Sequence, residues 1–283
     1  MIQADLIYDI GAHHGNDTAW YLQQGYRVVA VEANPILAKE LEKKFSGAIQ
    51  DKMLKVQNIA ITENDNESIP FFISRDDWRS STRKNIAERE AEIVQTAQIT
   101  GVKLSTLFEK YGIPHYCKID IEGNDAVAIN SLAGKINTPS YISCEISCHS
   151  IADVQKNNEL LYETINSLQA AGYTSFQLID QDNLLQLTDK KHYSRLHSLY
   201  ARICTKLERF TGFYSSTYSN RHRTARERKV NIDYVTTPFG EDLTGTWTDY
   251  NTTREYIQFH FNDYYALTQN KELIFWVDLH ARK

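Results

Sequence analysis

Short apolar runs alternate with amphipathic segments through the first 62 residues of this 283-residue chain. Three of the runs predict buried strands, at 6–11, 27–32 and 53–62. Two segments between them carry helix signals, at 16–25 and 34–47. The second begins with Asn34 as a cap and Pro35 in the first helical position, where proline is favoured. Because helical crossovers make successive strands parallel, this order predicts a doubly wound α/β fold.

The alternation is interrupted once and then resumes. Residues 63–74 predict a turn and a return strand, and the charged stretch 75–93 predicts a cover over the sheet. Further helices are expected at 104–112, 124–134 and 159–172. Further strands are expected at 115–121, 140–146, 173–180 and 272–281.

A long segment separates the last two predicted strands. It spans about 90 residues, 181–271, which is too long for a plain loop. Apolar and aromatic residues recur there at helical spacing near 190–209 and 253–268. No linker composition divides the chain, so residues 1–283 are expected to form one domain, with an α-rich cap inserted over 181–271.

Composition restricts the possible partners and the compartment. The chain has 31 Lys and Arg against 36 Asp and Glu, a formal net charge of −5. This charge does not favour binding to nucleic acid. No run is long and apolar enough to span a membrane, and Asp5 interrupts any secretion signal at the start. The cysteines lack C-x-x-C spacing: Cys117, Cys144, Cys148 and Cys204. We therefore expect reduced core cysteines and a cytoplasmic protein, with an oxidised pair as the lesser alternative.

The stretch "DIGAHHGND" (9–17) follows the first predicted strand and admits three interpretations. A dinucleotide fingerprint needs a glycine where His13 stands, so a nicotinamide cofactor is disfavoured. A phosphate-binding Walker loop needs a Gly-Lys-Ser/Thr that is absent here. The remaining interpretation is a nucleoside ligand without a phosphate, whose ribose diol would donate two hydrogen bonds to Glu32 at the end of the next strand. S-adenosylmethionine has such a ribose, together with an ammonium group.

Two longer motifs are more specific than the glycine loop. "DIGAHHGNDTAWYLQQGYRVVAVEANP" followed by "LSTLFEKYGIPHYCKIDIEGND" resembles the FkbM-type family of class I S-adenosylmethionine-dependent methyltransferases, over residues 5 to about 180. His13 stands where that family usually has Asn, and Asp125 where it usually has Glu. The resemblance implies a Rossmann-like, mostly parallel, seven-stranded sheet with an antiparallel last strand. It also implies methyl transfer to an oxygen atom.

The resemblance places the cofactor along residues 9–18 and 32–34. Gly11 would let the backbone approach the ligand, and Asp9 would hold the loop or face the ammonium group. Residues 16–18 could equally serve only to cap the first helix. The predicted cofactor-binding residues are Asp9, Gly11, Ala12, His13, Gly15, Asp17, Thr18, Glu32, Ala33, Asn34, Asn58 and Ala60.

The strand "HYCKIDIEG" carries unusual charge for a central parallel strand. Strand alternation would place Lys118, Asp120 and Glu122 on one face, at the carboxyl edge where open α/β sheets bind ligands. Methyl transfer requires alignment and a group that accepts the hydroxyl proton. The predicted catalytic residues are Asp120, Glu122, Glu145 and His149. The alternatives are a buried ion-pair network for the carboxylates and a backbone-bonded loop histidine at 149.

No metal is predicted. Adjacent side chains normally diverge, which makes His13 and His14 poor joint ligands, and there is no helical histidine pair or cysteine pair to support a site. The segment "SRDDWRSST" (74–82) is expected to close over the cofactor. The basic stretch 220–229 is either a solvated surface segment or a patch that attracts an anionic acceptor.

The sequence as a whole predicts an S-adenosylmethionine-dependent O-methyltransferase. Its acceptor would be a hydroxyl of a sugar, a glycan or a related natural product, with an anionic acceptor as one variant. The alternatives are a nicotinamide-dependent oxidoreductase and a non-catalytic binding module on the same fold. The sequence does not indicate an oligomeric state.

Overall fold

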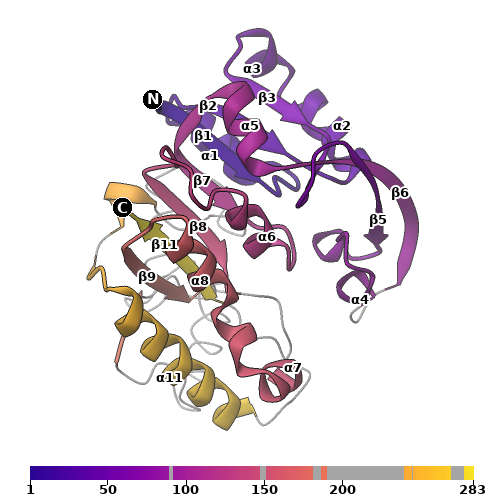
Figure 1. The fold of residues 1–283 in the computed structure, drawn as a ribbon. Coiled ribbons are helices and arrows are strands. Elements are labelled where there is room, and N and C mark those ends of the chain that lie inside the picture. Colours follow the sequence, from indigo (N-terminus) through magenta and orange to yellow (C-terminus); the bar gives the residue numbers. More distant parts are fainter. Residues whose placement is uncertain (89–91, 147–150, 181–185, 190–238, 244, 269–276) are drawn as a thin grey trace, which may run out of the picture.

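The computed structural model describes residues 1–88, 92–146, 151–180, 186–189, 239–243, 245–268 and 277–283. Its main sheet has eight strands in the order β10-β9-β11-β8-β7-β1-β2-β3 (Figure 1). These strands are β1 (Ile2–Ile10), β2 (Arg27–Val31), β3 (Leu54–Gln57), β7 (Ile113–Ile119), β8 (Tyr141–Glu145), β9 (Ser175–Asp180), β10 (Gln186–Leu187) and β11 (Val277–Arg282). The predicted α/β class and mostly parallel sheet are confirmed.

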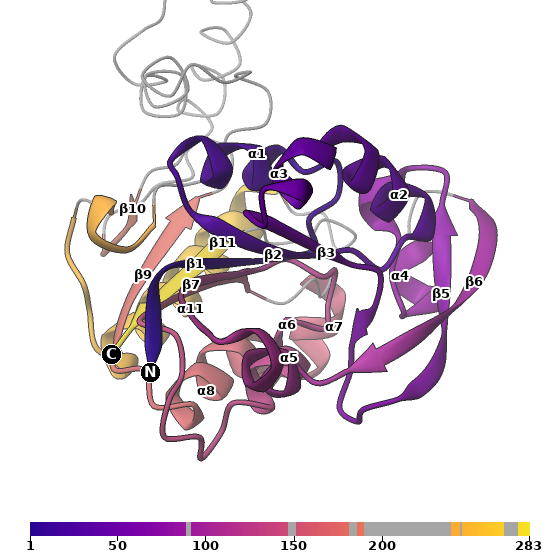
Figure 2. The ribbon, with the colours of Figure 1, turned by 90° about the horizontal axis from the view of Figure 1, so that it is seen from above.

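The described α-helices are α1 (Asn16–Gln23), α2 (Pro35–Lys44), α3 (Ser46–Gln50), α4 (Lys84–Ala87), α5 (Leu104–Tyr111), α6 (Asp125–Asn130), α7 (Ile151–Lys156), α8 (Glu163–Ala170) and α11 (Tyr250–Thr268). Three short 3₁₀ helices accompany them: η1 (Asp77–Arg79), η2 (Asn158–Tyr162) and η4 (Gly240–Asp242). Figure 2 shows α1, α2 and α3 on one face of the sheet and α5 to α8 on the other.

Helices cover both faces of the sheet because each face buries an apolar cluster. Trp20 and Tyr21 of α1 pack with Leu41 of α2 on the first face. The second face buries a larger cluster, to which α5, α6, α8 and α11 all contribute. Because the strands between the helices are buried on both faces, they are apolar runs rather than alternating ones, as parallel strands usually are.

Two strands of the main sheet run against the others: β11, as predicted, and the short β10, which pairs antiparallel with β9. β11 pairs antiparallel with β8 and β9, while β1, β2, β3, β7 and β8 pair in parallel. The predicted count of seven strands is wrong by one. The two-residue strand β10 adds to the free edge of β9, at Gln186 and Leu187, and is too short to be detected from periodicity.

A second sheet of three strands was not predicted as such. It contains β4 (Ala60–Ile61), β5 (Glu67–Ser74) and β6 (Ile93–Val102) in the order β4-β6-β5. The predicted return strand is β5. The predicted strand 53–62 is divided, because its last residues pair with Gly101 and Val102 of β6 instead of continuing beside β2.

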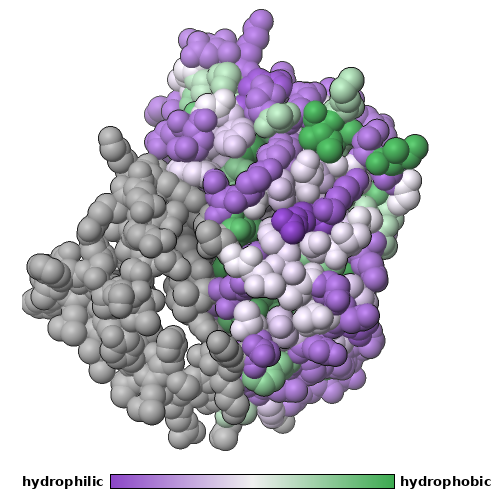
Figure 3. All heavy atoms as spheres, turned by 90° about the vertical axis from the view of Figure 1, so that its left-hand side faces the viewer, coloured by the Kyte–Doolittle hydropathy of each residue, from purple (hydrophilic) through white to green (hydrophobic). Residues whose placement is uncertain are grey.

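The described part of the insertion 181–271 belongs to the body of the domain. The helix expected at 253–268 is α11, whose Ile257 and Phe261 are buried in the larger core cluster. Phe239 stacks on Tyr116 of β7, with 4.1 Å between ring centroids. The predicted helix 190–209 and the basic stretch 220–229 lie outside the described residues. Where the face in Figure 3 is described, it is mostly hydrophilic, with hydrophobic residues in small separate groups.

Cys117 and Cys144 are free, buried core residues, as expected, and the other two cysteines lie outside the described residues. None of the helices in the described ranges has both the length and the apolar character required to cross a membrane.

Candidate active site

A cavity of about 330 Å³ opens where β1, β2 and β7 end. Parallel strands present their carboxyl ends at one edge, which is where ligands bind in open α/β sheets. Most of the predicted site residues line this cavity: Gly11, Ala12, His13, Asp17, Glu32, Ala33, Ala60, Asp120 and Glu122. Its volume lies within the range of small-molecule sites, roughly 300–1,000 Å³.

The glycine loop needs its glycines for packing. A Cβ atom on Gly11, whose φ is +88°, would collide with the backbone carbonyl of Asp120. Gly15 is the left-handed N-cap of α1, and a Cβ there would collide with Leu41 and Phe45. Gly11 also lines the cavity, whereas Gly15 faces α2 and does not. The loop can therefore follow the ends of β1 and β7 closely enough to form the floor of the cavity.

Two backbone hydrogen bonds fix the Glu32 carboxylate at the cavity. Its Oε2 accepts a hydrogen bond from the His13 backbone N–H, and its Oε1 accepts one from the Asn34 backbone N–H, both at 2.7 Å. Burial raises the pKa of this carboxyl to about 7, although both backbone donors oppose the shift. A carboxylate offers about four acceptor positions, so two remain for a ligand.

Asp9 is fully buried beneath the loop and does not line the cavity. Its Oδ2 accepts a hydrogen bond of 2.6 Å from the Thr18 hydroxyl, and among the described residues its Oδ1 has no hydrogen-bond partner. Burial raises the pKa of Asp9 to about 6. Of the two predicted roles for Asp9, the structure shows the anchoring one, because Thr18 ties the start of α1 to the end of β1.

A charged network joins α1 to the end of β7. The Lys118 ammonium lies 2.8 Å from Asp17 Oδ2 and 3.2 Å from Asp120 Oδ2. Burial opposes the charge of Lys118, but Asp17, Asp120 and Asp9 outweigh that effect and raise its pKa well above the usual value. An ion-pair network of this kind was the alternative interpretation of the carboxylates on this strand, and Lys118 forms it with Asp17 and Asp120. The network leaves the Asp120 side chain 36% exposed at the cavity, where it can meet a ligand.

The segment 74–82 lies beside the cavity, as expected. Asp77, Ser80 and Thr82 line it. The Ser81 hydroxyl donates to the Glu122 carbonyl at 3.1 Å, and the Asn124 side-chain amide donates to the Thr82 hydroxyl at 2.6 Å. These bonds hold the segment against the loop that follows β7.

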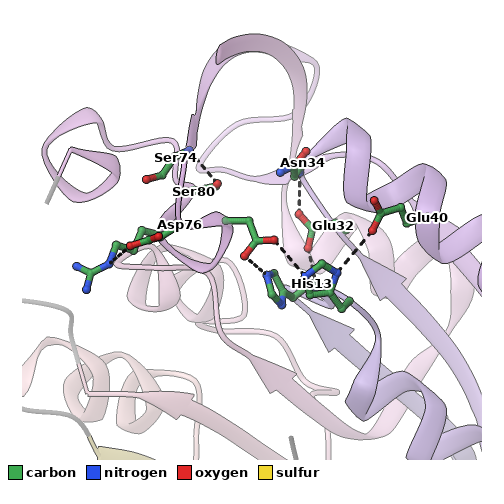
Figure 4. A network of polar contacts seen from close by, with 10 residues as sticks. His13, Glu32, Asn34, Glu40, Ser74, Asp76 and Ser80 are labelled. Atoms are coloured by element: carbon green, nitrogen blue, oxygen red, sulfur yellow. Dashed lines mark hydrogen bonds and ion pairs between the residues drawn. The ribbon is translucent and has the colours of Figure 1, made fainter. Parts of the chain in front are cut away.

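The two adjacent histidines converge, contrary to the sequence-based expectation. His13 has a left-handed backbone (φ +48°), which turns consecutive side chains to the same side, and the two rings lie 4.1 Å apart. His13 Nε2 lies 3.0 Å from Asp77 Oδ1, and His14 Nε2 lies 3.1 Å from Asp77 Oδ2. Figure 4 shows His13 next to Glu32, with Glu40 of α2 nearby. The glycine loop and the segment 74–82 therefore meet at Asp77.

Six of the predicted site residues that the structure describes do not line the cavity. Glu145 is buried at the end of β8 and does not line the cavity. The Asn34 side chain caps α2, and the Asn58 side-chain amide donates to the carbonyl groups of Glu32 and Ala33. Gly15 and Thr18 support the loop from outside the cavity, as Asp9 does. His149 lies outside the described residues.

The sequence analysis missed several residues that line the cavity. They include Phe71, Asp77, Thr82 and Asn124. Asp77 and Thr82 stood in the segment that we expected near the cofactor, but no residue type or spacing separated them from their charged neighbours. The hydrogen bond between Asn124 and Thr82 joins residues 42 positions apart, which a pattern in one sequence does not reveal.

Comparison with known proteins decides the family. A model described as the methyltransferase FkbM domain matches residues 9–175, which is more than half of the chain. The chain belongs to the FkbM methyltransferase family. The resemblance inferred from the two motifs is confirmed, and membership of this family supports S-adenosylmethionine as the cofactor.

Individual relatives are distant. A dimethyladenosine transferase of Schizosaccharomyces pombe is 26% identical over 123 residues, which cover 41% of this chain and 39% of that protein. The chain thus matches well under half the length of this curated relative.

Two solved methyltransferases show similarly weak likeness. An O-methyltransferase from Bacillus cereus, solved with S-adenosylhomocysteine, is 14% identical over 62% of this chain and 67% of its own, with a TM-score of 0.36. A putative sarcosine dimethylglycine methyltransferase from Galdieria sulphuraria is 9% identical over 99% and 78%, with a TM-score of 0.38. Likeness at this level carries no information about the acceptor.

Proposed function

We propose that this FkbM protein transfers the methyl group of S-adenosylmethionine to a hydroxyl of a sugar, a glycan or a related natural product. The observation that carries the proposal is the arrangement of the cavity. A diol-accepting carboxylate, Glu32, lies at one side, and a lysine-paired carboxylate, Asp120, lies at the other. When bound, the cofactor supplies a methyl group already activated on a sulfonium.

The donor half of the cavity fits the cofactor. Glu32 has two acceptor positions left for the two ribose hydroxyls, since its backbone bonds use the others. Ile59, Ala60 and Ile61 give an apolar wall on which the adenine ring can lie. The Asp17 carboxylate lines the cavity next to the glycine loop, where it can attract the ammonium group of the methionine part. Each of these three groups therefore has a matching part of the cofactor.

The acceptor half provides groups that can orient a hydroxyl and accept its proton. Asp120 is partly exposed, lies at the cavity edge, and keeps its charge balanced by Lys118 at 3.2 Å. Glu122 lines the same edge. We assign proton acceptance to Asp120, because an ionised carboxylate within hydrogen-bond reach of the acceptor oxygen is the simplest base that the geometry offers. Alignment of the hydroxyl with the methyl group would supply much of the remaining rate.

The test is a transfer assay that measures S-adenosylhomocysteine release with two matched panels of acceptors. One panel has free sugar hydroxyls, with neutral and phosphorylated members, and the other has primary or aromatic amines. Turnover restricted to the hydroxyl panel, and lost in Asp120→Asn, supports the proposal. Turnover with amines alone would refute oxygen as the methyl acceptor.

Two other functions are distinguished by binding measurements. A nicotinamide cofactor would need room where the His13 side chain lines the cavity. Quenching or enhancement of NADH fluorescence on titration would support that alternative against the present proposal. A binding module without catalysis would bind S-adenosylmethionine but release no S-adenosylhomocysteine with any member of the panels.

A further inference from the structure

We infer that His13, His14 and Asp77 form a binding site for a divalent transition metal of the zinc class, at the edge of the cofactor cavity. The inference replaces our expectation of no metal, because that expectation rested largely on divergent histidines and the two side chains converge. It rests on these three side chains and does not depend on the transfer reaction proposed above.

The geometry matches the requirements of such an ion. Zinc binds imidazole nitrogen and carboxylate oxygen at about 2.0–2.2 Å, so two ligand atoms on one ion lie about 3.0–3.4 Å apart at bond angles of 90–110°. The two histidine nitrogens lie 3.0 and 3.1 Å from the two oxygens of Asp77. All three ligand atoms lie within 4.8 Å of one another, a spread that rotation of the side chains can close.

The chemistry of the ligands also suits a metal. Imidazole nitrogen and carboxylate oxygen are both donors that zinc binds in proteins. His13 Nε2 is shielded from solvent and, among the described residues, lacks a well-aligned hydrogen bond in spite of its closeness to Asp77. A cation between the three side chains would satisfy that nitrogen by direct coordination.

The surroundings provide the outer groups that metal sites usually have. Histidine ligands commonly direct their other ring nitrogen to a carboxylate, which fixes the ring. Glu40 Oε2 lies 3.6 Å from His14 Nδ1, within a small movement of such a bond. Because all three ligands line the cavity, a fourth coordination position can be taken by water or by a ligand oxygen.

The ion would tie together two segments that are far apart in sequence. His13 and His14 belong to the glycine loop, while Asp77 begins η1 in the segment beside β5. Without a metal, the same contact would consist of two imidazole N–H groups facing one carboxylate. That protein-only contact is the alternative that the experiment must exclude.

The experiment uses the full chain, first freed of metal with a chelator that is then removed by dialysis. Cobalt(II) is titrated and its visible absorption recorded, since four-coordinate cobalt absorbs more strongly than hexaaqua cobalt, and zinc is titrated by calorimetry. The variants are His14→Gln and Asp77→Asn. The matched control is His115→Gln, whose ring lies 3.3 Å from Glu241 in a second histidine–carboxylate pair that does not line the cavity.

One cobalt per chain with the four-coordinate spectrum, at least tenfold weaker in His14→Gln and Asp77→Asn but unchanged in His115→Gln, would support the site. The absence of zinc and cobalt binding in the unmodified chain would overturn it, as would equal binding in all variants. Calorimetry of S-adenosylhomocysteine on the same metal-free protein keeps the two proposals apart. Cofactor binding without metal binding refutes only the metal site, and the reverse result refutes only the cofactor assignment.

Discussion

The assignment of Glu32 to the ribose predicts a large loss of cofactor affinity from the exchange of one heavy atom. In Glu32→Gln, one carboxylate oxygen becomes an amide nitrogen. Both oxygens now accept backbone N–H groups, from His13 and Asn34 at 2.7 Å. The amide can keep only one of these bonds, and its NH₂ group must face the other N–H or displace it.

The size of the expected affinity loss follows from the hydrogen bonds to the ribose that are lost or weakened. One charge-assisted bond to the ribose would disappear and the other would become a neutral one, each change worth about 1–3 kcal/mol. Together they amount to about 2–6 kcal/mol, which corresponds to roughly 30-fold to 20,000-fold weaker binding of S-adenosylhomocysteine. Titration calorimetry measures this loss directly. The same substitution at an exposed glutamate that pairs with a surface lysine, Glu109→Gln, is the control and should leave affinity unchanged.

A 2′-deoxy analogue of S-adenosylhomocysteine separates contact with the ribose from damage to the loop. If Glu32 binds the diol, removing the 2′ hydroxyl weakens binding strongly in the unmodified chain and little in Glu32→Gln. Because the pKa of Glu32 is raised to about 7, the unmodified chain should also bind more weakly as pH falls below about 7, by up to tenfold per unit. Equal analogue penalties in both proteins, or an affinity loss below threefold, would refute the ribose assignment.

Three further predictions test the catalytic carboxylate, the glycine loop and a core histidine. Asp120→Asn should lower kcat by roughly 100-fold to 10,000-fold, while the affinity for S-adenosylhomocysteine changes by less than about threefold. A variant that loses mainly cofactor affinity and keeps its kcat would argue against Asp120 as the base. Gly11→Ala should lower the free energy of unfolding by more than about 2 kcal/mol, because the new Cβ would collide with the Asp120 carbonyl. Gly25 has a similar φ but no atom near the position of a Cβ, so Gly25→Ala should cost only the backbone strain of about 1–2 kcal/mol. Burial lowers the pKa of His280 to about 3, so as pH falls this histidine is protonated in the unfolded chain before it is protonated in the folded chain. The free energy of unfolding from chemical denaturation should therefore be about 1.4 kcal/mol lower at pH 5.5 than at pH 7.5 through this residue, and His280→Leu should lack that difference.

The sequence predicted the parts of the fold that depend on local patterns. The apolar runs before residue 62 and after residue 104 became strands of the main sheet, because burial on both faces requires such runs. The second sheet escaped detection because β6 is largely exposed, with no apolar run in Ile93–Val102 to mark it. The division of the third predicted strand depends on β6 as a partner, which is a long-range pairing that periodicity does not contain.

The candidate site was predicted where a residue's role follows from its position at a strand end. Glu32 and Asp120 follow β2 and β7, and both line the cavity. Residues whose role depends on a distant partner were harder. His13 and His14 converge because of a left-handed backbone at a non-glycine residue, and Asp77 meets them from a segment 63 residues farther along than His14. Neither fact follows from spacing.

The structure also explains why this cavity is poised for a ligand. Asp9 and Glu32 are buried carboxyls with raised pKa values, so their ionised forms are destabilised in the unliganded protein. Lys118 supplies positive charge near Asp9, but Asp17 and Asp120 lie in direct contact with it. A cationic ligand with a diol would stabilise both ionised carboxylates, because its positive charge would lie near the loop and its hydroxyls would donate hydrogen bonds to Glu32. S-adenosylmethionine has both features, whereas its demethylated product lacks the sulfonium charge. The same electrostatics that favour the donor would therefore hold the product less tightly.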